Sequence, residues 1–258
     1  MAKIYLGDTI DIHAGGEDLI FPHHENEIAQ SEAANDKPFA KYWLHNGFIT
    51  IDNEKMSKSA GNFFNVREIV EHFPYEVIRF FILNGHYRSP INFSDKLMQA
   101  CQNGLDRIKN CKNDLNYYID NTSKEFQENE KSALEEIEKY KLQFELAMDD
   151  DFNTADAITA IYELVRFINK GIKEEISKDL AIKERDMLKH LCSVLGILED
   201  DEVIQKDEDT EKIEELIAKR TEAKKNKDFA TADAIRNELL NMGVTIKDTR
   251  QGVQWFKG

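Results

Sequence analysis

Two lysines stand three positions apart in a short run of small and hydroxyl-bearing side chains, Lys-Met-Ser-Lys-Ser, which an Ala-Gly-Asn sequence follows. We call residues 55–59 the lysine loop. The positive charge of Lys55 and Lys58 can close over a polyphosphate as negative charge develops, and phosphoryl-type chemistry depends mostly on such positioning and charge stabilisation. A lysine pair flanked by serines is usually a solvated turn, so composition alone does not decide between these interpretations.

A histidine and a glutamate stand at helical spacing in the run Phe-Pro-His-His-Glu-Asn-Glu, residues 21–27. His23 and Glu27 are four residues apart, and such residues share one face of a helix. An imidazole and a carboxylate can ligate one zinc ion, although a zinc site needs three or four protein ligands. On spacing alone, a surface His–Glu pair at the start of a helix is the commoner interpretation.

A glycine pair follows a predicted strand. Residues 9–13 alternate polar and apolar side chains, as a half-buried strand does. Gly15 and Gly16 come directly afterwards and would let a ligand approach the backbone closely, and Asp18 can hydrogen-bond a ribose hydroxyl. A Gly-Gly turn is weak evidence by itself, because most such turns only satisfy backbone geometry.

Strand and helix patterns mix in the segment that must position these groups. A helix is predicted from Pro22, since proline suits a first helical turn, to Ala34. Residues 46–52 predict a short strand before the lysine loop. The glycine pair and the lysine loop would each then follow a strand, as nucleotide-binding groups of α/β domains do.

Helical patterns dominate after residue 66. Caps and apolar periodicity predict helices over 66–83, from Ser94–Asp95 onward, over 125–147, from the cap at 151–154, and over 180–198, 211–225 and 229–242. Asp228 is the expected N-cap of the last helix and Gly243 its C-terminal stop. Residues 244–246 and 253–255 predict a small terminal β-hairpin.

Charge is unevenly distributed along the 258 residues, whose formal net charge is −15. Residues 199–209 hold seven acidic side chains against one lysine, which gives this short stretch a charge of −6 and predicts a solvated linker. The overall acidity argues against a broad nucleic-acid footprint. The segment after the linker is nearly balanced, so the C-terminal end is the expected contact surface for RNA.

The cysteine usage and the absence of targeting signals indicate a cytoplasmic protein. Cys101, Cys111 and Cys192 are widely spaced and form no disulfide framework. The first residues lack a secretory signal, and no apolar run approaches the roughly 20 residues that span a bilayer. We therefore expect no membrane association.

Taken together and in order, these motifs resemble the cysteinyl-tRNA synthetase family of class I aminoacyl-tRNA synthetases. The resemblance rests on residues 7–30, which contain the Phe-Pro-His-His-Glu-Asn-Glu run, and on the lysine loop, which matches the signature loop of class I. Residues 149–154 look like the start of the family's helical anticodon-binding domain. Residues 233–236 and 248–252 look like its small terminal module.

The resemblance implies a role for each matched residue. His23 and Glu27 match two ligands of an active-site zinc ion (Zn2+), which binds the substrate sulfur and so rejects serine, a one-atom variant that pocket shape separates poorly. Lys58 matches the ATP-binding lysine, and Lys55 supports it. The remaining matches are Gly15, Gly16 and Asp18 at the adenosine, His13 beside the substrate pocket, and Arg220, Asp233, Arg236 and Asp248 at the anticodon.

The departures from the family pattern are equally informative. The family's His-x-Gly-His motif and its two zinc cysteines have no counterpart here, because all three cysteines follow the lysine loop in predicted helices. The resemblance therefore covers the C-terminal half of the family's length. Two zinc ligands out of four make a poor site, and half an α/β sheet exposes an unpaired edge, so we expect the chain alone to be inactive or nearly so.

The predicted fold class is an α/β remnant, the C-terminal half of a Rossmann-like catalytic domain, followed by mostly α-helical domains and a small α+β C-terminal module. The expected divisions are the catalytic half with the lysine loop (1–66), a helical stem-contact region (67–125), a helical anticodon-binding bundle (126–198), an acidic linker (199–210) and an anticodon-recognition module (211–258).

The predicted function is part of a cysteine–tRNA ligase. Such an enzyme joins cysteine to ATP, used with Mg2+, to give cysteinyl adenylate and pyrophosphate, and then moves the cysteinyl group to tRNA(Cys). The expected partners are tRNA(Cys), cysteine and ATP, with the protein a monomer or complemented by an N-terminal fragment. The alternative is a non-catalytic module in which roughly residues 130–258 bind the anticodon arm, and the order of the motifs disfavours an unrelated acidic helical protein.

Overall fold

Two parallel strands begin the α/β part of the chain. The computed structural model describes residues 2–51, 54–55, 65–199, 208–226, 228–249 and 252–257. Helix α1 (Ala2–Leu6) precedes strand β1 (Ile10–Gly16), which pairs in parallel with strand β2 (Ala40–Asn46). Ile10 lies opposite Ala40, and Gly16 lies opposite Asn46.

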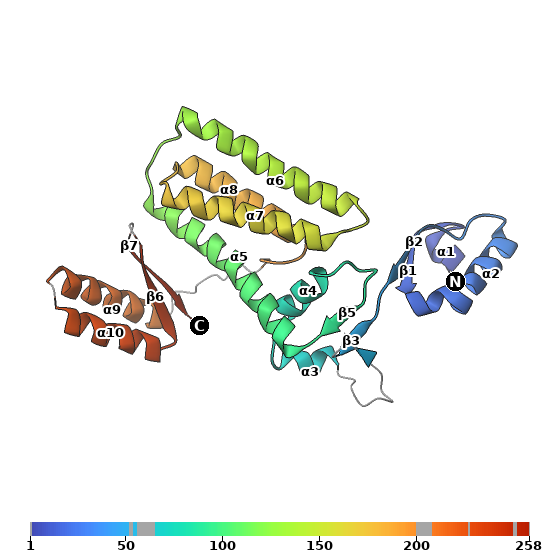
Figure 1. Cartoon of the computed structure of the whole chain (residues 1–258), viewed down its shortest axis with the longest axis horizontal. Coiled ribbons are helices and arrows are strands. Elements are labelled where there is room, and N and C mark those ends of the chain that lie inside the picture. Colours follow the sequence, from blue (N-terminus) through green and yellow to red (C-terminus); the bar gives the residue numbers. More distant parts are fainter. Residues whose placement is uncertain are drawn as a thin grey trace.

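The connection from β1 to β2 contains three helical segments. A 3-10 turn, η1 (Glu17–Leu19), leads into a π-helical turn, η2 (Ile20–His24), and then into helix α2 (Glu25–Asn35). Strand β1, helix α2 and strand β2 therefore form a βαβ unit, the connection that parallel strands require (Figure 1).

Few side chains of this βαβ unit are buried. Within described residues 2–51, only Ile10 and His24 are buried. Ile12 and Tyr42, on the two neighbouring strands, are 57% and 67% exposed. Parallel sheets are normally covered on both faces, so this unit leaves uncovered an apolar surface that such folds ordinarily bury.

A second small sheet holds the start of the lysine loop. Its order is β4–β3–β5, formed by β4 (Glu54–Lys55), β3 (Ile49–Ile51) and β5 (Ile91–Phe93), with β3 antiparallel to β4 and parallel to β5. Gly47 precedes β3 where a side chain has no room, because a Cβ there would lie 2.5 Å from the backbone carbon of Ser89. This close approach brings the chain before β3 beside the chain before β5.

The predicted helix over residues 66–83 is two helices. Helix α3 (Val66–Val70) begins at a capping box formed by Asn65 and Glu68, and helix α4 (Tyr75–Leu83) begins after Pro74. Proline disfavours the helical conformation at the residue before it, which explains the break. Four apolar residues of α4 are buried, so α4 anchors this region on the helices that follow.

Four long helices form the centre of the molecule. They are α5 (Asp95–Asn121), α6 (Lys131–Asp149), α7 (Thr154–Lys173) and α8 (Lys178–Val194), with the 3-10 turn η3 (Glu128–Glu130) before α6. Helices α6, α7 and α8 pack on one another, while α5 packs on α7 and α8 and also on α4 (Figure 1). One hydrophobic core runs from Val77 to Leu198, so the predicted stem-contact and anticodon-binding segments share a single core.

The caps predicted for these helices are confirmed. Ser94 accepts a hydrogen bond from the backbone N–H of Leu97 at 3.3 Å, and Asn153 accepts one from Asp156 at 3.2 Å. Ser177 caps α8 in the same way, which places its beginning two residues before the predicted one. Each cap satisfies a backbone donor that the first helical turn leaves free.

The C-terminal module has its own small core. Helix α9 (Glu208–Lys225) packs on helix α10 (Phe229–Asn241), and strands β6 (Val244–Thr249) and β7 (Gly252–Lys257) form an antiparallel hairpin. The core comprises Ile213, Leu216, Ile235, Leu239 and Val244, with Trp255 packed against it. Asp228 caps α10, and Gly243 adopts the left-handed conformation (φ 73°) that ends it, as predicted.

Candidate functional site

A cluster of three possible metal ligands lies at the end of β1. His13 comes from β1, His24 from the end of η2, and Glu27 from the first turn of α2. One ligand atom from each lies within 4.8 Å of the other two. His13 Nε2 donates a hydrogen bond to Glu27 Oε2 at 2.6 Å.

Gly15 makes the position of His24 possible. A Cβ at residue 15 would lie 2.8 Å from His24 Cε1 and 2.9 Å from His24 Nε2, which is closer than real side chains approach. The His24 ring therefore lies directly against the backbone of β1, where it is only 5% exposed. The glycine pair predicted to admit a nucleotide admits, at this position, a histidine of the chain itself.

Aromatic residues of β2 and the segment before it hold the two imidazoles. His24 Nδ1 shares a hydrogen bond of 2.8 Å with His45 Nε2. The His13 ring packs at 4.7 Å from Trp43 and 5.2 Å from Phe39, measured between ring centroids. A hydrogen bond to the second ring nitrogen is the usual way in which a metal-ligating histidine is oriented.

The surroundings of His24 favour its neutral form. Burial lowers the pKa of His24, and the neighbouring His13 and His45 lower it further, outweighing the opposite effect of Glu27. A neutral imidazole is the form that binds metals. With the carboxylate of Glu27, the cluster offers nitrogen and oxygen donors of the kinds that zinc accepts.

The structure places His13 and His24 beside Glu27, and not His23, which the sequence paired with Glu27. His23 is exposed and lies outside the three-residue group. The four-residue spacing assumed an α-helix from Pro22, but the α-helix begins at Glu25, and the turn before it is kinked at Phe21, whose backbone is extended (φ −130°, ψ 132°). The role of His23 as a zinc ligand stays a prediction.

The remaining residues predicted to contact the nucleotide lie near this cluster in the chain. Gly16 ends β1, and a Cβ there would lie 2.6 Å from Asp18 Oδ1, so this glycine allows the Asp18 side chain to fold back over the strand end. Asp18 is exposed in η1. Lys55 lies in β4 opposite Thr50, whereas Lys58 lies outside the described residues.

The four predicted anticodon residues divide into two pairs. Arg220 is 4% exposed and binds Asp248 through two hydrogen bonds of 2.8 and 3.0 Å. Lys224 binds the same carboxylate at 2.6 Å. The hydrogen bonds from Arg220, and then the one from Lys224, lower the pKa of Asp248. Arg220 thus joins α9 to β6, whereas Asp233 and Arg236 are exposed on α10. The role of these four residues at the anticodon stays a prediction.

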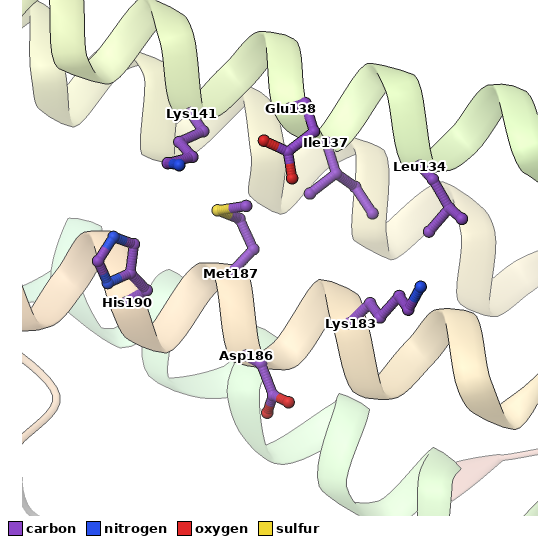
Figure 2. A pocket seen from close by; sticks show the side chains of 8 residues that line it. All are labelled: Leu134, Ile137, Glu138, Lys141, Lys183, Asp186, Met187 and His190. Carbon is purple, nitrogen blue, oxygen red and sulfur yellow. The ribbon is translucent and has the colours of Figure 1, made fainter.

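A groove of about 440 Å³ separates α6 from α8 in the helical bundle (Figure 2). Leu134, Ile137 and Met187 supply its apolar side chains, and Lys141 and Lys183 are among its charged ones. None of the site residues predicted from the sequence lines it. The groove is therefore separate from the cluster at β1.

The sequence analysis did not predict His24 as a member of the cluster, or His45 as the hydrogen-bond partner of His24. His24 is next to a predicted ligand in the same run, so the two adjacent histidines indicated a possible metal ligand but did not show which ring is buried. His45 lies on β2, which the pattern of residues 40–46 did not predict. Only the parallel pairing, in which His13 lies opposite Trp43 and Gly15 opposite His45, brings it beside the cluster.

Comparison with known families gives three matches in order along the chain. The models are described as the tRNA synthetases class I (C) catalytic domain (residues 1–103), the DALR domain (143–199) and the Cysteinyl-tRNA ligase anticodon binding domain (207–255).

Curated relatives match over essentially the whole chain. A protein named Cysteine--tRNA ligase from Clostridioides difficile (strain 630) is 51% identical over 99% of this chain, and one of the same name from Lachnospira eligens is 53% identical over 100%. The matched region is 54% of each relative. The chain therefore spans about half the length of the curated relatives it matches.

Solved structures share the fold at low sequence identity. LeuRS of Agrobacterium radiobacter K84, in a ternary complex with tRNA and LeuAMS, has a TM-score of 0.60 at 21% identity, covering 71% of this chain and 25% of that one. Mycobacterium tuberculosis methionyl-tRNA synthetase in complex with methionyl-adenylate has a TM-score of 0.52 at 19% identity, covering 72% and 40%. None of the helices in the described part of the chain has the length and apolar composition needed to cross a bilayer.

Proposed function

We propose, on the premise that the chain belongs to the cysteinyl-tRNA synthetase family, that it carries part of the active site and the tRNA-binding elements of a cysteine–tRNA ligase. The observation that carries this proposal is the alignment of the whole chain with such ligases at 50% identity or more. The whole enzyme would form cysteinyl adenylate from cysteine and ATP, with Mg2+, and transfer the cysteinyl group to tRNA(Cys).

The proposed nucleotide-binding residues have complementary tasks. Lys58, supported by Lys55, would neutralise charge on the ATP phosphates as pyrophosphate leaves, because a positioned cation stabilises the developing charge without reorganisation. Gly16 and Asp18, at the carboxyl end of β1, would contact the adenosine together with Gly15, since ligands of open α/β sheets bind beyond the carboxyl ends of strands. His13, in the middle of β1, would lie beside the substrate.

The residues present fit a zinc ion. His13, His24 and Glu27 offer two imidazoles and a carboxylate whose ligand atoms lie within 4.8 Å of one another, and catalytic zinc sites use three such ligands with a fourth position open. The family resemblance assigns His23 with Glu27, so we propose Glu27 and one or both histidines of the His23–His24 pair as ligands. When bound, zinc supplies a bond to the substrate thiolate that the hydroxyl of serine cannot imitate at neutral pH.

The exposed apolar surface of the βαβ unit indicates that the chain needs further strands and helices, packed on this surface, for activity. Ile12 and Tyr42 lie exposed on a two-stranded parallel sheet, and such sheets are stable when further strands and helices cover them. We propose that the part of the fold which the relatives carry outside the matched region packs here and completes the active site. The chain by itself would then have no synthetase activity.

Residues of α10 are the proposed anticodon contacts. Asp233 and Arg236 are exposed on this helix. Arg220 and Asp248, which pair with each other between α9 and β6, are proposed as contacts beside them. A module of this size that presents a few polar side chains from one helix can distinguish bases in a single-stranded loop.

The test is cysteine-dependent exchange of pyrophosphate into ATP. The chain is joined to the remaining part of the Clostridioides difficile relative, and the fused protein is compared with the chain alone. We expect exchange by the fused protein, none by the chain alone, and a loss of roughly a hundredfold or more on Lys58→Ala, as for other groups that stabilise transition-state charge. Exchange by the chain alone, or an unaffected Lys58→Ala protein, would contradict the proposal.

A second candidate function is tRNA binding without catalysis. The bundle and the C-terminal module each have a hydrophobic core of their own, whereas the βαβ unit buries only Ile10 and His24 of the residues described there. Salt-sensitive binding of tRNA(Cys) by the chain, with no exchange even in the fused protein, would favour this alternative.

A further inference from the structure

A polar contact joins the helical bundle to the segment before β5. Asp151, just before α7, accepts a hydrogen bond from the Tyr87 hydroxyl through Oδ1 at 2.8 Å. Its Oδ2 lies 2.5 Å from Arg88 Nε, which also donates a hydrogen bond to the Tyr87 hydroxyl at 3.1 Å. The three side chains thus join the turn between α6 and α7 to the connection from α4 to β5, 64 residues away in the chain (Figure 1).

The surroundings of this contact hold Asp151 in its charged form. The Arg88 guanidinium carbon lies 5.6 Å from the centroid of the Tyr87 ring, and the His86 ring stacks on that ring at 5.1 Å between centroids. A cation near an aromatic face is favourable. The hydrogen bond from Tyr87, and then the one from Arg88, outweigh burial and lower the pKa of Asp151, so its carboxylate is ionised at neutral pH.

The backbone that presents Asp151 adopts an uncommon conformation. Asp151 and Phe152 both lie in the left-handed region, with φ of 54° and 55°, where residues other than glycine are rare. The backbone N–H of Phe152 donates to the Met148 carbonyl, and that of Asn153 donates to the Ala147 carbonyl, each at 3.1 Å. Such conformations persist where the surrounding structure holds them, and they cluster at functional positions.

A gain in folding stability is a poor explanation for this arrangement. The side chains of Asp151 and Arg88 are 39% and 58% exposed, and exposed ion pairs contribute little to stability. The hydrophobic core that runs from Val77 to Leu198 includes neither residue. The definite consequence of the contact is geometric, because it fixes residues 86–89 relative to the beginning of α7.

Residues 86–89 in turn hold the chain before β3. The Gly47 N–H donates a hydrogen bond to the Tyr87 carbonyl at 2.8 Å, and a Cβ at Gly47 would lie 2.5 Å from the backbone carbon of Ser89. The Ile91 N–H donates to the Phe48 carbonyl at 2.9 Å, where the parallel pairing of β3 with β5 begins. The backbone that enters β3 is therefore attached directly to Tyr87.

Strand β3 carries the backbone of the first residue of the lysine loop. Thr50 of β3 lies opposite Lys55 of β4, and Thr50 Oγ1 donates a hydrogen bond to Asn92 Oδ1 of β5 at 3.2 Å. In the described sheet, β4 pairs with β3 alone. A path of direct contacts therefore runs from Asp151 to the backbone of Lys55.

We propose that Asp151 is a positioning residue that, through Tyr87 and Arg88, sets the place of β3 and so of Lys55, where the lysine loop begins. The inference rests on the proposed function, in which the lysines of this loop neutralise charge on the ATP phosphates. Asp151 itself contacts no substrate in this arrangement. A distant residue can still control the rate, because a displacement of about 1 Å at a catalytic group can slow a reaction roughly a hundredfold.

The test measures pyrophosphate exchange by the chain joined to the remaining part of the Clostridioides difficile relative. Asp151→Asn removes the charge that binds Arg88, and asparagine tolerates the left-handed backbone. We expect kcat to fall roughly tenfold or more while KM for cysteine stays unchanged, because the proposed cysteine site lies at β1 and not in this sheet. Asp150→Asn removes the adjacent exposed carboxylate and is the matched control, which should leave both quantities unchanged.

Two further measurements separate positioning from a loss of folded protein. The cysteinyl adenylate formed per mole of protein counts the competent sites, and the Asp151→Asn protein should have as many as the unaltered fused protein. Combining Arg88→Gln with Asp151→Asn should lower kcat about as much as the more damaging single change does, because the effects of residues that act as a unit are not additive.

Hydrogen–deuterium exchange of the full chain follows the position of β3 without any activity. Asp151→Asn should speed the exchange of the β3 amides at residues 49–51, because the segment that holds this strand loses its attachment to the bundle. The amides of α8 should exchange as before. Asp150→Asn should change neither region.

Several results would overturn the proposal. They are an unchanged kcat in the Asp151→Asn protein, a loss of kcat matched by a loss of competent sites, additive losses from Asp151→Asn and Arg88→Gln, and unchanged hydrogen–deuterium exchange in β3. Absence of pyrophosphate exchange by the unaltered fused protein would contradict the proposed function instead. The hydrogen–deuterium result on the chain would then still decide whether Asp151 positions β3.

Discussion

Replacing Glu184 with glutamine should make the helical bundle progressively more stable, relative to the unaltered chain, as the pH rises. Glu184 is fully buried, and its pKa is about 8 in the folded chain against an ordinary value of 4.5. The folded protein therefore binds this proton more tightly than the unfolded chain does. The stability that this group contributes is greatest below pH 4.5 and falls as the pH rises toward 8.

The size of the effect follows from the pKa difference. Each pKa unit corresponds to about 1.4 kcal/mol, so this carboxyl group makes the unfolding free energy on the order of 3 to 5 kcal/mol smaller at pH 8 than at pH 4. Glutamine does not titrate. It still leaves a buried amide with few partners, which costs about 1 to 3 kcal/mol at every pH, so the diagnostic quantity is the pH dependence and not the absolute stability.

The assay is urea unfolding followed by far-ultraviolet circular dichroism at pH 5, 6, 7 and 8, which reports mainly on the long helices of the bundle. The difference in unfolding free energy between the Glu184→Gln protein and the unaltered chain should increase by about 3 kcal/mol from pH 5 to pH 8. Asp186→Asn should show no such trend. Parallel pH profiles for the glutamine variant and the unaltered chain would refute the assignment of a buried protonated carboxyl group.

Three further predictions concern the other two parts of the chain. If His24 is a zinc ligand, His24→Ala should abolish zinc binding by the fused protein, measured by metal analysis after dialysis. If His23 is the ligand, as the family resemblance implies, His23→Ala should abolish it. Retention of one zinc ion by both variants would exclude both histidines as essential ligands. Gly15→Ala should lower zinc affinity by at least tenfold, because the new Cβ would lie 2.8 Å from the His24 ring, and an unchanged affinity would contradict that packing. Asp248→Asn should destabilise the C-terminal module by about 1 to 3 kcal/mol, which Trp255 fluorescence would show as unfolding at a lower urea concentration. Because the pKa of Asp248 is lowered, the stability that its carboxylate provides is present above pH 3.8 and is lost at lower pH. A variant as stable as the unaltered protein at pH 7 would contradict the structural role of this ion pair.

The helical part of the fold follows closely from the sequence, because its signals are local. Ser94, Asn153 and Asp228 cap the helices that the pattern predicted, and Gly243 ends the last of them. The terminal hairpin was also predicted, from two short apolar runs around a turn. These features depend on neighbouring residues, so a single sequence specifies them.

The candidate site was predicted less completely, because it depends on contacts between distant residues and on one irregular turn. Strand β2 lacks a clear alternation, and its pairing with β1 is what brings His45 beside His24. The kinked turn before α2, with Phe21 in an extended conformation, precedes the two histidines, and helical spacing did not predict that His24 is the buried one. The burial of Arg220 likewise became visible only when β6 placed Asp248 against α9.

The most direct test of the central claim is attachment of labelled cysteine to tRNA(Cys) by the chain fused to the remaining part of a cysteine–tRNA ligase relative. The account predicts that the fused protein charges the tRNA with cysteine, excludes serine by a large factor, and loses charging when Lys58 or Glu27 is replaced by alanine. Absence of charging by a folded, zinc-loaded fused protein, or equal charging with serine, would contradict it.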